Sequence, residues 1–308
     1  MMATWKTWIR AARPRTVLLS FSGVLLGGFL SFYQFRDLGL TQHPSCCVLL
    51  LAALTAVLLQ VVSNLANDYG DFKKGTDGKD RVGPPREMQS GNLTEKEMVG
   101  GLVLMVLLCL VTGVSLLLSF LLANGSWTEV LVFAALGAGA VLAALFYTLG
   151  RHPYGYRGWG DVFCFLFFGW AAVAGTCYLA NSTLDFTVLL PASAMGFLST
   201  AVLNINNMRD YENDRASGKD SLVVKMGLKK AYVYHALLIG LAFFCLVLYL
   251  ILHHTAWYCY SFLVISLCFV KDVVSIPKTK PELLDPFLGR QVRHSFLLVL
   301  VYGILLLL

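Results

Sequence analysis

Nine apolar runs of membrane-spanning length restrict the folds that this sequence can adopt. A helix needs about 20 apolar residues to cross the hydrocarbon core of a bilayer. Of the 308 residues, 57% are hydrophobic and 14% are charged, against roughly 45–50% and 25% in soluble domains. The sequence therefore predicts an all-α, polytopic membrane bundle of about nine helices, at residues 16–35, 47–66, 98–122, 128–149, 161–180, 186–205, 231–252, 256–271 and 294–308. The last two runs are short, so eight helices is the alternative.

The positions of the basic residues predict how the bundle is oriented. Of the 24 Lys and Arg residues, all but Arg36 lie in the amino-terminal segment or in every second connection after it. Cytoplasmic segments carry an excess of Lys and Arg. We therefore predict a multi-pass protein of the inner (plasma) membrane with a cytoplasmic amino terminus. The net charge of +6 follows from this topology and from anionic lipid, and gives no reason to expect a nucleic-acid partner.

Two acidic clusters follow the second and the sixth apolar runs. Each cluster places three polar side chains on one helical face: Asn64, Asp68 and Asp71 in the first, Asn206, Asp210 and Asp214 in the second. The cost of an Asp in a membrane is roughly 2.5–3.5 kcal/mol at mid-depth and falls toward the interface. Solvated charges beyond a helix end are the alternative interpretation.

The spacing of the two clusters indicates an internal repeat. The first Asn of each cluster and the first Asp of each cluster are both 142 positions apart. We therefore predict a single domain, 1–308, built from two weakly similar halves (about 10–125 and 126–230) and three C-terminal helices. Both clusters are expected to face one cavity, open to the cytoplasm, and the last three helices are expected to serve packing.

The residue types around this cavity indicate a magnesium–diphosphate site. Oxygen ligands without Cys or His suit Mg²⁺, which binds a few carboxylates together with phosphate oxygens. The polar segment from Phe72 to Glu97 brings Arg81 and Arg86, stiffened by two prolines, and Arg forks fit phosphate. Arg215 and Lys219 follow the second cluster. Solvated loop charges are again the alternative for these cations.

Aromatic residues and an amino-terminal pair of arginines add to the predicted site. Tyr147, Tyr154 and Tyr156 lie near the fourth connection. They are expected either to face a carbocation, which aromatic rings stabilise, or to form an ordinary interfacial belt. Arg13 or Arg15 is expected to meet an anionic substrate, with a topology signal as the alternative.

Several motifs together resemble the UbiA superfamily of intramembrane aromatic prenyltransferases. The segments that carry the resemblance are Asn-Leu-Ala-Asn-Asp-Tyr-Gly-Asp (64–71), Asp-Arg-Val-Gly-Pro (80–84), Pro-Tyr-Gly-Tyr (153–156), Gly160-Asp161, Leu-Asn-Ile-Asn-Asn-Met-Arg-Asp (203–210) and Gly-Lys-Asp-Ser-Leu-Val-Val-Lys-Met-Gly (218–227). Within the superfamily they look like the menaquinone branch. The likeness covers about 10–230, whereas the last third agrees in hydropathy only.

The resemblance implies a fold of nine helices, a reaction and roles for the site residues. The reaction is Mg²⁺-dependent transfer of a prenyl chain from a polyprenyl diphosphate to 1,4-dihydroxy-2-naphthoate, with loss of carbon dioxide and diphosphate, giving demethylmenaquinol. Each acidic cluster would hold one of two Mg²⁺ ions. The substrate-binding residues would be Asn64, Asn67, Arg81, Arg86, Asn206, Asn207, Arg215, Lys219 and Arg13, while Tyr147, Tyr154 or Tyr156 would line the cation pocket.

The sequence departs from the superfamily at one position. Gly75 stands where a further Asp often extends the first motif. That carboxylate is therefore absent here unless Asp77 substitutes for it. The acceptor also stays open, because 4-hydroxybenzoate, homogentisate or a chlorophyll precursor would suit the same charges and spacing. A membrane transporter is the alternative from another class, since repeated halves and intramembrane acids occur there too.

Overall fold

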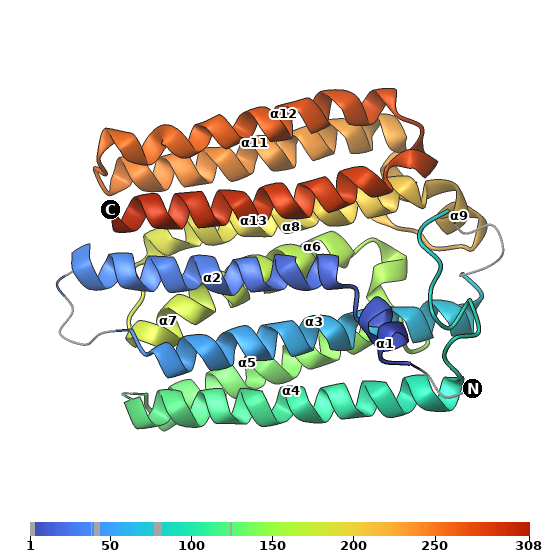
Figure 1. Cartoon of the computed structure of the whole chain (residues 1–308), viewed down its shortest axis with the longest axis horizontal. Coiled ribbons are helices and arrows are strands. Elements are labelled where there is room, and N and C mark those ends of the chain that lie inside the picture. The colour runs from blue at the N-terminus through green and yellow to red at the C-terminus, as the bar shows by residue number, and fades with distance from the viewer. Residues whose placement is uncertain (1–3, 38, 40–43, 77–81, 124) are drawn as a thin grey trace.

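The computed structural model describes residues 4–37, 39, 44–76, 82–123 and 125–308, and this part of the chain is helical and contains no strand (Figure 1). Within it, nine segments are long and apolar enough to span a membrane, as predicted. They are α2 (Pro14–Asp37), α3 (Cys46–Lys74), α4 (Glu95–Ala123), α5 (Trp127–Phe146), the composite of α6 (Gly160–Cys164), η2 (Phe165–Ala174) and α7 (Gly175–Asn181), the composite of η3 (Phe186–Val188) and α8 (Leu189–Arg209), α11 (Leu228–Leu252), the composite of η4 (Trp257–Ile265), α12 (Ser266–Ser275) and η5 (Ile276–Lys278), and α13 (Asp285–Leu307).

The spanning segments form three groups in the view of Figure 1. Helices α3, α4 and α5 pack together on one side, and α11, α12 and α13 gather on the other. Between them lie α2 and the α6–α8 region, which contact both groups. The main apolar core follows this middle group and its C-terminal neighbours, because it contains buried side chains such as Leu26, Met195 and Tyr302.

The short elements gather at one end of the bundle, which we call the motif end because it also carries both acidic clusters. They are α1 (Trp5–Ala12), η1 (Tyr154–Arg157), α9 (Tyr211–Ala216), α10 (Leu222–Met226) and η6 (Pro281–Leu283). The carboxyl terminus lies at the opposite end (Figure 1). An odd number of spans produces this separation of the termini.

The last span begins earlier in the structure than its apolar run does in the sequence. The last apolar run starts at residue 294, whereas α13 already begins at Asp285. Its first turns contain the buried polar Gln291, and Asp285 itself pairs with residues of α2 and α8. Hydropathy alone does not detect helical turns whose polar side chains face other helices. The sequence analysis therefore predicted a start for this span that is too late.

The middle of the bundle is held by unusually close helix contacts. The stretch η2 is π-helical over ten residues, a rare geometry that often occurs at functional sites. It packs on α8 at Gly169 and Gly196. A Cβ at Gly169 would lie 2.6 Å from the carbonyl oxygen of Ala192, and one at Gly196 would lie 2.8 Å from that of Phe165. Only glycine permits this approach, which fixes how η2 lies against the cavity.

Candidate functional site

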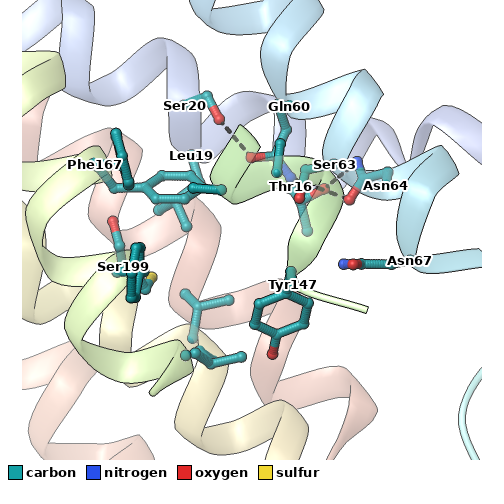
Figure 2. Close-up of a pocket in the computed structure, with 18 of the residues that line it drawn as sticks. Thr16, Leu19, Ser20, Gln60, Ser63, Asn64, Asn67, Tyr147, Phe167 and Ser199 are labelled. Atoms are coloured by element: carbon teal, nitrogen blue, oxygen red, sulfur yellow. Dashed lines mark hydrogen bonds between the residues drawn. The ribbon is translucent and has the colours of Figure 1, made fainter. Parts of the chain in front are cut away.

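A cavity of about 230 Å³ lies at the motif end, between α2, α3, α5, the α6–η2 region and α8. Its polar lining comes from both acidic clusters, from neighbouring cations and from uncharged side chains such as Ser20, Gln60 and Ser199, and the rest of its lining is apolar. Figure 2 shows polar side chains of α2 and α3 facing Phe167, Leu19 and Tyr147 across the space. The residues that carry the argument below are Arg13, Thr16, Ser20, Gln60, Asn64, Asn67, Asp71, Arg86, Tyr147, Tyr154, Phe163, Phe167, Asn206 and Lys219.

The first acidic cluster occupies the last turns of α3, where Gly75 ends the helix with a positive φ of 71°. Asn64, Asn67 and Asp71 line the cavity, while Asp68 is buried but is not part of the cavity wall. Gly70 lets the chain after α5 approach, since a Cβ there would lie 2.5 Å from the Thr148 hydroxyl oxygen. The helix end therefore presents amide and carboxylate oxygens to one space.

Asp71 is held by two residues from other parts of the chain. Its Oδ1 accepts a hydrogen bond of 2.7 Å from the Tyr156 hydroxyl, and its Oδ2 lies 2.6 Å from Nη1 of Arg86. Arg86 also donates to the backbone oxygen of Asn67 at 2.8 Å. The Arg86 and Asp71 side chains are only 9% and 3% exposed, which makes this ion pair strong and specific in geometry. The segment between α3 and α4 thereby delivers a guanidinium to the site, and a substrate-binding role for Arg86 stays a prediction.

Asn64 is part of a hydrogen-bonded chain that joins α3 to α2. Its Nδ2 donates to the Ala12 carbonyl at 2.8 Å and to the Thr16 hydroxyl at 2.9 Å. Its Oδ1 accepts from Gln60 Nε2 at 3.1 Å, and Gln60 in turn accepts from Ser20 at 2.8 Å (Figure 2). These partners suit a residue that positions the α1–α2 junction, and a metal-binding role for Asn64 stays a prediction.

The second acidic cluster spans the break between α8 and α9. Asp210 accepts from its neighbour Arg209 through both oxygens, at 2.8 Å each, and Asn206 lines the cavity. Asp214 pairs with Lys219 at 3.3 Å, whereas its Oδ2 is buried and accepts no hydrogen bond from the described residues. Burial raises the pKa of Asp214 to about 6, against the opposing charge of Lys219. Within the described part of the chain, one oxygen of this carboxyl group is thus left without a hydrogen-bond donor.

Lys219 brings the two clusters together. It is buried and lines the cavity. Burial lowers its pKa, but the carboxylates of Asp214, Asp71 and Asp210 outweigh this and raise the pKa above the ordinary value. A side-chain hydrogen bond joins the same regions: Asn213 Nδ2 donates to the Thr76 carbonyl at 3.1 Å. The two clusters therefore meet at one place, as the repeat in the sequence predicted.

A network behind the second cluster includes a residue that the sequence analysis did not single out. Asp285, at the start of α13, accepts from Arg209 Nη1 at 2.7 Å and from Arg15 Nη1 at 2.9 Å. Arg209 is only 4% exposed, and its guanidinium bridges Asp285 and Asp210. The only hint in the sequence is an acid next to Pro286 before an apolar run. Arg15 is committed to this pair rather than to the cavity.

Aromatic rings form one wall of the cavity. Tyr147 and Tyr154 meet edge to face at 5.3 Å, Tyr154 stacks on Phe163 at 4.2 Å, and Phe163 lies parallel to Phe167 at 6.2 Å between ring centroids. Gly155 and Gly160 make room for the Tyr147 ring. Phe163 and Phe167 were missed by the sequence analysis, because they are indistinguishable there from other apolar residues of the span.

Other predicted site residues lie elsewhere. Tyr156 is not part of the cavity wall; its hydroxyl binds Asp71 and Thr76, and Lys74 lies over its ring at 4.6 Å. Arg215 is exposed, and Asn207 is buried without lining the cavity. Arg81, Asp77 and Asp80 lie outside the described residues.

Arg13 does line the cavity, at the sharp break between α1 and α2. Its backbone has φ 50° and ψ 73°, a left-handed conformation that costs about 1–2 kcal/mol for a residue with a Cβ. Pro14 follows directly and opens α2. The strained turn at the α1–α2 junction thus places Arg13 in the lining of the cavity.

The structure combines a bundle of membrane-spanning helices with a cavity that carries acidic and basic groups at one end. This combination indicates an integral membrane enzyme. The chain belongs to the UbiA prenyltransferase family, whose sequence pattern matches residues 21–297. The chain is 40% identical to "1,4-dihydroxy-2-naphthoate octaprenyltransferase" of Escherichia coli (strain K12), over 98% of this chain and 96% of that protein. It is 34% identical to the protein of the same name in Mycobacterium tuberculosis, over 73% and 72%.

Solved structures show the same fold. A UbiA homolog from Archaeoglobus fulgidus bound to GPP and Mg²⁺ superimposes with a TM-score of 0.67 at 16% identity, over 97% of this chain and 99% of that one. The apo structure of a UbiA homolog from Aeropyrum pernix K1 superimposes with a TM-score of 0.62 at 17% identity. These likenesses establish the nine-span architecture of this chain as that of the family.

Proposed function

We propose that this protein transfers a polyprenyl chain from a polyprenyl diphosphate to 1,4-dihydroxy-2-naphthoate. The observation that carries the proposal is a single cavity in which Asp71, Arg86 and Lys219 lie at the motif end and aromatic and apolar side chains lie beyond them. Polar groups at the mouth suit a diphosphate, and the apolar remainder suits an isoprenoid. Near-full-length relatives at 37–40% identity carry the name of a 1,4-dihydroxy-2-naphthoate octaprenyltransferase, which supports this acceptor.

The reaction breaks the bond between the allylic carbon and the diphosphate oxygen, and the bonding pair leaves with the diphosphate. The ring carbon that bears the carboxylate then bonds to the allylic carbon. Loss of carbon dioxide returns electrons to the ring and gives demethylmenaquinol. Because decarboxylation replaces loss of a ring proton, this step needs no protein base at that carbon.

The donor set fits Mg²⁺. Within the described residues, no three His, Cys, Asp or Glu side chains gather into a ready-made metal group. Mg²⁺, however, usually takes one or two carboxylates and completes its shell with water and substrate phosphate. Among the described residues, no group donates a hydrogen bond to the buried Oδ2 of Asp214, so this oxygen is available as such a ligand. When bound, the metal neutralises negative charge on the departing diphosphate.

We assign two Mg²⁺ ions, one to each acidic cluster. Asn64, Asp68 and Asp71 would serve the first, and Asn206, Asp210 and Asp214 the second. Arg86 and Lys219 form ion pairs with Asp71 and Asp214, and both cations would bind diphosphate oxygens in the loaded site. Asn67, Asn207, Arg215 and Arg81 complete the proposed substrate-binding set.

Tyr147 and Tyr154 face the allylic carbon in this proposal. Their rings, with Phe163 and Phe167, stabilise a developing positive charge through their faces and keep water from it. Tyr156 serves as a positioning residue in this proposal, because its hydroxyl donates to Asp71 and holds that carboxylate in place. Arg13, which lines the cavity, is our candidate for the acceptor carboxylate, since a guanidinium group binds a carboxylate in bidentate fashion.

The motif end is proposed to face the cytoplasm, with the amino terminus, in the inner (plasma) membrane. The excess of Lys and Arg at this end supports the orientation. The division into two related halves, about 10–125 and 126–230, is likewise a proposal, supported by the meeting of the two clusters at Lys219.

The experiment that tests the function offers two acceptors in parallel. Membranes containing the protein are supplied with Mg²⁺ and a labelled polyprenyl diphosphate, together with either 1,4-dihydroxy-2-naphthoate or 4-hydroxybenzoate. We expect a decarboxylated, prenylated product, identified by mass, from the naphthoate alone. Product from 4-hydroxybenzoate alone would keep the prenyl transfer and overturn the acceptor. No product from either would overturn the proposed function.

A further inference from the structure

A second cavity, of about 530 Å³, lies on the outer surface of the bundle and shares no lining residue with the first. We call it the outer groove. Its walls are the α6–η2 region, α8 and α11, and α10 and the turn after η1 close it at the motif end. The α6–η2 region separates the two cavities: Phe163 and Phe167 face the first, whereas Val162 and Leu166 face the outer groove.

The outer groove runs along the membrane normal at the depth of acyl chains. Thr200 lies nine residues before the end of α8, and Leu238 lies ten residues after the start of α11. At 1.5 Å per residue, the groove extends about 15 Å into the spanning part. Val162 and Leu166 are 46% and 37% exposed on its rim, so it opens toward the surface that lipid surrounds. Phe165, Phe197 and Leu238 make its interior apolar.

The end of the groove nearest the motif end is basic. Arg157 and Lys225 are exposed there, and Lys225 Nζ donates to the Arg157 carbonyl at 2.6 Å, which fixes its position at the mouth. The one carboxylate in the lining, Asp161, is 6% exposed and accepts from the Tyr234 hydroxyl at 3.2 Å. Two exposed cations against one buried, hydrogen-bonded acid leave the mouth attractive to an anion.

We propose that the outer groove binds a glycerophospholipid of the adjacent leaflet. Lys225 and Arg157 bind its phosphate, and one acyl chain lies between Phe165, Phe197 and Leu238. The amphipathic profile carries this assignment: a basic end at the level where headgroups lie, followed by about 15 Å of apolar recess. A second copy of this chain fits less well, because a helix face would meet a recess with a charged mouth rather than a flat apolar surface.

The bound lipid would contact the turn after η1, which lies between the outer groove and the residues that shape the first cavity. The Asp220 amide donates to the Tyr156 carbonyl at 3.1 Å, and a Cβ at Gly158 would lie 3.3 Å from Lys225 Nζ. Tyr156 in turn holds Asp71. The lipid phosphate would therefore brace the turn after η1, next to the residues that fix the first acidic cluster.

Mass spectrometry of the intact protein released from detergent tests the proposal, with dioleoyl phosphatidylglycerol added as the probe. We expect one phospholipid to stay bound to the wild type at collision energies that strip all others. Val162→Trp fills the groove and should lose this lipid. Val233→Trp is the matched control, because Val233 is also exposed, at 61%, on α11 but does not line the groove, and it should retain the lipid.

Charge variants provide an independent measurement should the tryptophan variant fail to assemble. Lys225→Gln and Arg157→Gln, both at exposed positions, should each lower lipid retention about tenfold, whereas Lys96→Gln, an exposed lysine of α4, should not. Equal retention by Val162→Trp and Val233→Trp, or by Lys225→Gln and Lys96→Gln, would overturn the proposal. So would a polyprenyl diphosphate that displaces the phospholipid from the wild type at equal concentration.

Discussion

The two acidic clusters are repeated in the sequence but are held in different ways. In the first, Asp71 is bound by Arg86 and Tyr156, which both come from connections between spans. In the second, Asp210 is bound by Arg209 of α8, and Arg209 is itself anchored by Asp285 of α13. Connections can shift when a substrate arrives, whereas packed helices resist displacement. We infer that Asp71 exchanges its partners during turnover, whereas Asp210 stays fixed against Arg209.

The largest expected effect tests whether both clusters are needed at all. Asp68→Asn and Asp210→Asn should each lower turnover by about 1000-fold or more, because each removes charge that holds metal against the diphosphate. Product formation at saturating Mg²⁺ is the measurement, and elution as a monodisperse species in detergent is the control for assembly. Near-wild-type turnover in either variant would break the two-cluster site.

Substitutions of Arg86 and Arg209 should have different effects, because Arg86 is proposed to change partners during turnover and Arg209 is proposed to stay in place. Arg86→Gln should raise the KM for the polyprenyl diphosphate about 10- to 100-fold, because a charge-assisted contact contributes about 1.5–3 kcal/mol. Arg209→Gln should instead lower the melting temperature, since it leaves Asp210 and Asp285 without their common partner. If Arg209→Gln also acted mainly on KM for the diphosphate, the distinction between the clusters would be lost.

Asp285 sharpens the comparison at longer range, because it touches Arg209 but does not line the cavity. Asp285→Asn should weaken the apparent affinity for Mg²⁺ about 5- to 10-fold, since Arg209 would then compete more strongly for Asp210. Asp285→Glu keeps the charge and should restore most of that affinity. Arg15→Gln removes only the exposed half of the network, and its effect should be smaller. Equal Mg²⁺ affinity in the Asn and Glu variants would limit Asp285 to a structural role.

The last prediction concerns pH and stability rather than turnover. Burial raises the pKa of Asp214 in the folded protein to about 6, above its ordinary value of 3.8. The folded state therefore binds this proton more tightly than the unfolded state, so without Mg²⁺ stability should fall as pH rises from about 4 to about 6. A shift of about two pKa units corresponds to a change of at most about 3 kcal/mol. Melting temperatures in EDTA across this range should show the slope, and Asp214→Asn should remove it. An unchanged slope in that variant would assign the proton to another group.

The sequence predicted most of the fold because spans and basic residues are local signals. Apolar length located the nine spans, and the acid motifs marked the end where they meet. What it missed depends on how helices face one another. Asp285 is far from Arg209 in the chain, and Phe163 looks like any other apolar residue of its span. Tyr156 was one of three tyrosines proposed for the cation pocket, and nothing in the sequence indicated that its hydroxyl would donate to Asp71.

The α6–η2 region has a recess on each face, and this has a pharmacological consequence. A compound that fills the outer groove shares no contact residue with either substrate in the active cavity. Raising the concentration of donor or acceptor would therefore not displace it. Such a compound would act by stiffening or shifting the common wall, so its inhibition would be noncompetitive. Resistance substitutions against it would arise at positions such as Val162 and Leu166, outside the catalytic residues.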